Sequence, residues 1–119
     1  MEREDRVERL AGVVSGWPGI TAAPHRFGGT GFRFGRGEIG HVHPDGLVDV
    51  PFPRPVRDRI VAAGKARPHH VLPNSGWVSL PVRSEADLDA AIELLRLSYD
   101  LRREHAAERG GSAQRPGSP

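Results

Sequence analysis

The chain has 119 residues, 37% of them hydrophobic and 27% charged, and a formal net charge of +2, which predicts one domain with a modest core. It contains no cysteine, which excludes disulfides and thiolate chemistry, and so small a positive charge is not the signature of a strongly basic nucleic-acid-binding domain. No apolar run approaches the roughly 20 residues of a membrane helix, and the first residues lack the apolar segment of a signal peptide. We therefore expect a cytoplasmic protein with no membrane partner.

A helix and two strands are predicted in the first third of the chain. Residues 2–15 place hydrophobic side chains at helical spacing and predict an amphipathic helix. Residues 20–27 predict a first strand, which Pro24 interrupts and a glycine pair ends. Phe32 and Phe34 alternate with other residues and predict a second strand, which a Gly-Arg-Gly turn connects to the next one.

The most informative stretch follows, at residues 35–53, and reads GRGEIGHVHPDGLVDVPFP. A strand over residues 38–43 would place Ile39, His41 and His43 on one face, because side chains alternate along a strand. The Asp-Gly pair after it is a strong hairpin signal, and residues 47–52 return as the partner strand.

Two registers of this hairpin remain open. A three-residue loop of Pro44, Asp45 and Gly46 places His41 opposite Asp49, where the carboxylate would fix the imidazole tautomer and raise the imidazole pKa. A two-residue loop instead turns the histidines to the apolar face of the return strand, since a slip by one residue exchanges the two faces. Pro44 cannot donate a ladder hydrogen bond, which favours the three-residue loop.

The next segment combines a short helix, a loop and a strand. Residues 55–64 predict the helix, with proline at its first position and glycine at its end. His69 and His70 lie in a proline-containing loop or irregular strand. Residues 77–82 alternate and predict a strand with one buried face.

The chain closes with its clearest helix and a polar tail. Ser84 opens the helix in a pattern that resembles a capping box, and a hydrophobic stripe continues to an expected end near Glu104. Residues 106–119 are rich in Gly, Ser, Gln and Pro and predict a disordered tail, so the domain is expected to span residues 1–105.

This order of elements predicts an α+β fold in which helices pack on one face of an antiparallel sheet. The other face should carry polar side chains and would be free to bind a ligand.

The segment GRGEIGHVHPDG, with the later HH, GWVSLP and LSYDL, resembles the luciferase-domain family over roughly residues 31–101. That family is named for the fungal luciferases and includes small bacterial members. The fungal enzymes oxidise a hydroxylated styrylpyrone with molecular oxygen and need no metal or organic cofactor. The resemblance implies that His41 and His43, with Glu38 and Asp45 around them, correspond to family positions. If the chain is an enzyme, the resemblance implies a cofactor-independent, oxygenase-like activity.

A looser similarity, in the order of elements and in the Gly-Trp-Val and Ser-Tyr pairs, links the chain to the MmcQ/YjbR family. That resemblance implies a YjbR-like double-wing fold. It supplies the alternative function, a non-enzymatic module that binds nucleic acid or protein.

The candidate site residues combine the predicted sheet face and its neighbouring loops with the positions that the luciferase-domain resemblance implies. We expect the ligand to be small and aromatic or enolic, and the candidate catalytic residues are His41, His43 and His70. The candidate ligand-binding residues are Glu38, Asp45, Asp49, Trp77 and Ser79. Two other uses of the histidines stay open. His41 and His43 with a loop histidine, His69 or His70, offer the three nitrogens of an open zinc or iron site. Alternatively, the histidines serve as polar strand residues or as hydrogen-bonding residues of the core.

Overall fold

The computed structural model describes residues 1–114, with side chains for residues 1–109. Within this part of the chain, three α-helices, a short 3-10 helix and six strands form an α+β fold, which confirms the predicted class. The elements are, in chain order, α1 (Arg3–Ser15), β1 (Ile20–Pro24), η1 (Arg26–Gly28), β2 (Thr30–Phe34), β3 (Gly37–Val42), β4 (Leu47–Pro51), α2 (Arg54–Ala62), β5 (Arg67–Pro68), β6 (Trp77–Pro81) and α3 (Glu85–Gln114).

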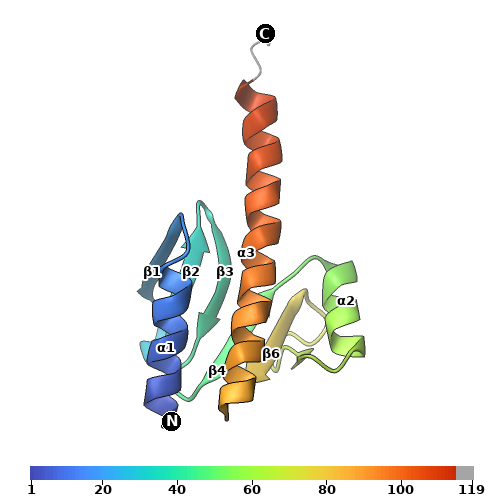
Figure 1. The fold of residues 1–119 in the computed structure, drawn as a ribbon. Coiled ribbons are helices and arrows are strands. Elements are labelled where there is room, and N and C mark those ends of the chain that lie inside the picture. The colour runs from blue at the N-terminus through green and yellow to red at the C-terminus, as the bar shows by residue number, and fades with distance from the viewer. Residues whose placement is uncertain (115–119) are drawn as a thin grey trace.

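The strands form one antiparallel sheet in the order β1-β2-β3-β4-β6-β5. Figure 1 shows α1 and α3 side by side across one face of this sheet, with α2 beyond the β6 side. We call the opposite side of the sheet the uncovered face. None of the described helices is both long and apolar enough to cross a membrane.

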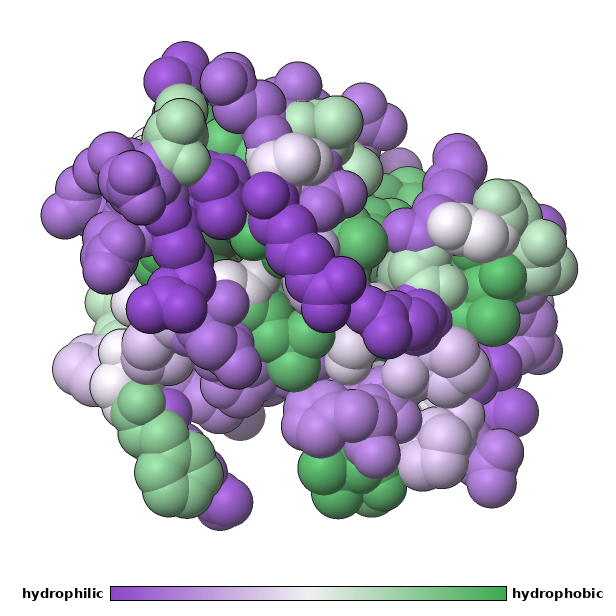
Figure 2. Space-filling model, turned by 90° about the horizontal axis from the view of Figure 1, so that it is seen from below, coloured by the Kyte–Doolittle hydropathy of each residue, from purple (hydrophilic) through white to green (hydrophobic). Residues whose placement is uncertain are grey.

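The hydrophobic core fills the space between the sheet and its covering helices, because both helices turn their apolar stripes inward. Leu10 and Val14 of α1 and Leu95 and Tyr99 of α3 are at most 1% exposed. The strands contribute mainly branched side chains, among them Ile39, Val42, Val48, Val50 and Val78. On the face seen in Figure 2, hydrophobic residues form separate small areas within a mostly hydrophilic surface.

A β-bulge in β3 corrects one prediction. Phe32 pairs with Gly40 and Arg33 pairs with Glu38, so Ile39 is an extra residue without a partner in β2. Ile39 is completely buried in the core, and the expectation that it shares a face with His41 was wrong. The alternation argument assumed a regular strand, and the bulge interrupts that period.

The hairpin between β3 and β4 has the three-residue loop that the sequence favoured. His41 pairs with Asp49 and Val42 pairs with Val48. The His43 amide donates to the Leu47 carbonyl oxygen at 2.8 Å and closes the loop. Gly46 has φ +92°, a left-handed conformation that glycine adopts without steric cost.

The last helix is longer than expected. It extends to Gln114, whereas the sequence predicted an end near Glu104. Alanine, glutamate and arginine dominate residues 106–109 and favour helix even where no core is available. Figure 1 shows this end of α3 running clear of the sheet. Of the tail predicted over residues 106–119, residues 115–119 lie outside the described residues.

Candidate functional site

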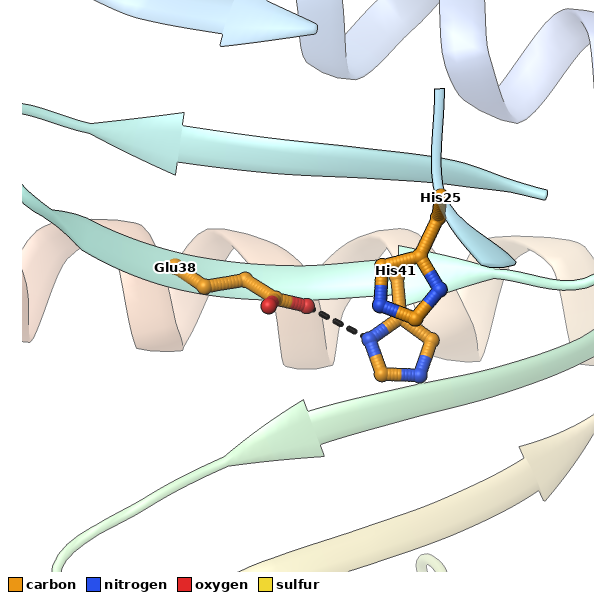
Figure 3. A group of neighbouring side chains, drawn as sticks. All are labelled: His25, Glu38 and His41. Carbon is orange, nitrogen blue, oxygen red and sulfur yellow. Dashed lines mark hydrogen bonds and ion pairs between the residues drawn. The ribbon is translucent and has the colours of Figure 1, made fainter. Parts of the chain in front are cut away.

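The candidate site lies on the uncovered face, where three neighbouring strands place polar residues in one row. Asp49 of β4 pairs with His41 on β3 and with Ser79 on β6. A Cβ atom added to Gly40 would meet Leu95 of α3, so Gly40 faces the helices. His41, the next residue, therefore points away from them. Figure 3 shows the His41 ring in front of the sheet, with α3 behind it.

Asp49 is the centre of this row. Its Oδ2 atom accepts hydrogen bonds from Nε2 of His41 at 3.0 Å and from Nε2 of His43 at 2.7 Å. Nε2 of His69 lies 3.5 Å from the same oxygen. The other oxygen, Oδ1, accepts the hydroxyl proton of Ser79 at 2.6 Å. We call Asp49 and these four side chains the Asp49 cluster.

The charge of Asp49 is maintained by its neighbours. Asp49 is only 1% exposed, and burial by itself would raise the pKa of its carboxyl group. The hydrogen bonds from His41, Ser79 and His43 outweigh burial and hold the pKa of Asp49 well below its usual range. The cluster is therefore built around a buried, ionised carboxylate.

His41 lies between two carboxylates. Nδ1 of His41 is 2.5 Å from Oε2 of Glu38, and Nε2 faces Asp49. Burial opposes a charge on this imidazole, but the hydrogen bonds to Asp49 and Glu38 prevail and raise the pKa of His41 to about 9. Residues three apart lie on opposite faces of a regular strand, so the bulge at Ile39 is what brings Glu38 to the side of His41.

His25, which no sequence pattern indicated as a site residue, joins this arrangement from the segment between β1 and η1. Its ring stacks on His41 with centroids 4.0 Å apart and an angle of 15° between the planes. Burial, and then the neighbouring His41, lower the pKa of His25. Gly31 makes room for the stack, since a Cβ there would lie 3.3 Å from the His25 ring. The space at Gly31 was the local signal, and a glycine alone does not specify which side chain fills that space.

In the loop after β5, His69 lies nearest Asp49, and donor atoms of the predicted His70, His69 and Asp49 all lie within 4.8 Å of one another. Backbone N–H groups of Val71 and Leu72 both donate to Nδ1 of His69 at 3.1 Å. Nδ1 is therefore unprotonated, and the proton of the neutral ring is on Nε2, facing Asp49. Burial lowers the pKa of His69, in agreement with a neutral ring. His70 is exposed and stacks on His69 with ring centroids 4.5 Å apart.

The remaining predicted site residues have distinct positions. Trp77 is half-buried, and its ring centroid lies 5.3 Å from that of His41. Asp45 is exposed in the hairpin loop, where its Oδ1 accepts the Leu47 amide proton at 3.0 Å, so it stabilises the turn. Glu38, His41, His43, Asp49, Trp77 and Ser79 are thus brought together, whereas Asp45 lies outside the hydrogen-bonded cluster.

A shallow depression of about 260 Å³ begins at the edge of the cluster. It is lined by Asp45, Leu47, Arg67, Pro68, His70, Ser79, Pro81 and Arg83. Ser79 connects it to Asp49, and the two arginines place positive charge around it. Larger hollows, such as one of about 760 Å³ between α2 and α3, lie away from the Asp49 cluster and carry no comparable set of chemical groups.

The fold and this cluster define a small α+β domain with a candidate binding site on the uncovered face of its sheet. The family model described as "Luciferase domain" matches residues 36–98, which is more than half of the chain. The chain belongs to the luciferase domain family. The matched residues include all of the Asp49 cluster, whereas His25 lies outside them. No curated protein and no solved structure matches the chain.

Proposed function

We propose that this luciferase-domain protein binds a small aromatic or enolic ligand on the uncovered sheet face and oxidises it with molecular oxygen. The observation that carries the proposal is Asp49, a buried carboxylate whose two oxygens are surrounded by imidazole and hydroxyl groups. The family, named for its luciferases, supplies the reaction class.

A purely structural role explains this cluster poorly. Removing a carboxylate from water is costly, and well-packed apolar residues generally give equal or greater stability at such positions. The cluster also lies on the side of the sheet that no described helix covers. Selection for a binding or catalytic role accounts for the cost.

The surroundings of the cluster favour a flat ligand with an acidic oxygen. Arg67 and Arg83 line the adjacent depression, and their two positive charges exceed the single negative charge of Asp45. On the other side of the row, Trp77 presents an aromatic ring beside His41. An enol or phenol that enters from the depression would meet cations first and imidazoles next.

Fluorescence titration with kojic acid, a hydroxylated pyrone with an acidic enol, tests the binding step. The chain has two tryptophans, of which Trp77 lies beside His41, while Trp17 lies against Tyr99 in the core region. Trp17→Phe removes the background and Trp77→Phe removes the reporter. We expect saturable quenching in wild type and Trp17→Phe that disappears in Trp77→Phe. Equal quenching in both variants, or none in wild type, would contradict the proposed site.

Oxygen consumption tests the oxidation step. In the proposed reaction the ligand is the electron donor and molecular oxygen is the acceptor. An oxygen electrode should record uptake that needs both the protein and kojic acid or catechol. His43→Ala should lose this uptake, while His105→Ala, a change on the exposed side of α3, should keep it. Saturable binding without oxygen uptake would limit the function to ligand binding.

A further inference from the structure

The nitrogen and oxygen atoms of the Asp49 cluster converge as the ligands of a metal ion do. Donor atoms of His41, His43 and Asp49 all lie within 4.8 Å of one another. The Asp49 Oδ2 atom is 3.0 Å from one imidazole nitrogen and 2.7 Å from the other. Adjacent ligands of an octahedral ion with bonds of roughly 2.1 Å are about 3.0 Å apart, so an ion would need only small adjustments of these side chains.

The hydrogen bonds that orient these donor groups also resemble those around a bound metal ion. Metal-binding histidines commonly use the second ring nitrogen to donate to a carboxylate, which orients the ring. His41 does so through Nδ1, which faces Glu38. Asp49 has its Oδ1 occupied by the Ser79 hydroxyl, so Oδ2 alone remains directed at the imidazoles. Two of the three donor groups, His41 and Asp49, are thus held in place by a separate outer partner.

Two neighbouring histidines are poor ligands, which defines the site further. Figure 3 shows the His25 ring stacked over His41, so the in-plane lone pairs of the two rings run side by side and do not converge on one point. His69 has its Nδ1 committed to two backbone N–H groups and therefore carries its proton on Nε2. Of the three groups of potential ligands among the described residues, His41, His43 and Asp49 therefore form the set that we favour, and it leaves coordination positions open.

We propose that His41, His43 and Asp49 bind one divalent first-row transition-metal ion, with Glu38 and Ser79 as positioning residues. Two imidazoles and a carboxylate suit iron, manganese, cobalt or zinc, whereas magnesium and calcium prefer sites made only of oxygen. This departs from the cofactor-independent activity that the family resemblance implies. The use of the ion rests on the proposed function, because a ligand enolate oxygen would occupy an open position.

Cobalt binding tests the site without any assumption about the ligand. Full-length protein, prepared without a histidine tag and stripped with a chelator, is titrated with Co²⁺, and visible absorption and calorimetry are recorded. We expect one equivalent to bind and to raise the unfolding temperature, since an ion that binds only the folded state stabilises it. His43→Ala and Asp49→Asn should weaken binding at least a hundredfold. Glu38→Gln and Ser79→Ala should weaken it about ten- to a hundredfold.

The matched control is His105, an exposed histidine of α3 that lies in none of the candidate ligand groups. His105→Ala should bind Co²⁺ with affinity within a few-fold of wild type. The proposal is overturned if wild type takes up no stoichiometric cobalt, or if this control loses binding while His43→Ala and Asp49→Asn keep it. Circular dichroism establishes whether each variant is folded. The cobalt titration of the wild type tests the proposal even if a variant does not fold.

Kojic acid binding by stripped and cobalt-loaded protein separates this proposal from the function above. If stripped protein binds kojic acid as tightly as loaded protein, the ion plays no part in ligand binding and its proposed use fails, while the proposed function stands. If loaded protein holds cobalt but neither form binds kojic acid, the metal site stands and the proposed function fails. Tighter binding by the loaded form alone supports both.

Discussion

Gly40→Ala should destabilise the protein because Gly40 is the point at which β3 approaches both α3 and β4. An added Cβ would collide with Cδ2 of Leu95 and lie 2.9 Å from the Asp49 carbonyl oxygen. Gly40 also has φ +152°, a conformation that residues with a side chain rarely adopt. Overpacking costs about 1–3 kcal/mol and the backbone conformation about 1–3 kcal/mol, so the expected loss is about 2–6 kcal/mol.

Urea unfolding monitored by circular dichroism measures this loss, and Leu95→Ala supplies the matched comparison. Leu95 is fully buried, so its truncation alone should cost about 2–5 kcal/mol. The double variant removes the collision with Leu95 but keeps the contact with the Asp49 carbonyl oxygen. Its destabilisation should therefore be smaller than the sum of the two single losses. An unchanged urea midpoint for Gly40→Ala, or strict additivity in the double variant, would refute this account of the bulge.

Three further changes test the contacts around the core and the site. Ser79→Ala leaves Oδ1 of the buried Asp49 carboxylate without its hydrogen-bond donor. The free energy of unfolding in urea should therefore fall by about 1–3 kcal/mol. An unchanged free energy of unfolding would mean that water replaces the hydroxyl. Tyr99→Phe removes the hydrogen bond to the Pro18 carbonyl oxygen at 2.6 Å and should cost about 0.5–1.5 kcal/mol, and an unchanged midpoint would show that this contact contributes nothing. Phe27 is 90% exposed and has φ +58°. Phe27→Gly should keep the thermal midpoint of the wild type, because relief of roughly 1–2 kcal/mol of backbone strain offsets the entropic cost of glycine. A clear fall in the midpoint would show that the exposed ring makes a stabilising contact.

The parts of the structure that follow from local rules could be read from the sequence. The hairpin loop is an example, because Pro44 cannot donate a ladder hydrogen bond and Asp45-Gly46 favours a turn. That register alone predicted that His41 lies opposite Asp49, as it does. The α+β class followed in the same way from the periodicity of the helices and strands.

The parts that depend on contacts between distant segments could not be predicted. The bulge at Ile39 arises where Gly40 packs closely on Leu95, and neither residue signals the other in the sequence. A regular strand would place Glu38 on the face of the sheet opposite His41, and only the bulge brings the two side chains together. The choice between His69 and His70 similarly depends on the path of a loop, which local pattern does not determine.

The central claim is that the Asp49 cluster forms a binding site, and His43→Ala tests it most directly. The His43 side chain is 24% exposed, is hydrogen-bonded to Asp49 through one nitrogen and packs edge-on against the His41 ring. It lies outside the hydrophobic core, so its removal creates no core cavity. Calorimetric titration with kojic acid and urea unfolding are performed on wild type and variant. We predict at least a tenfold loss of affinity with a nearly unchanged urea midpoint. Unchanged affinity together with a loss of about 1–3 kcal/mol in stability would show that the histidine is structural and would contradict the account.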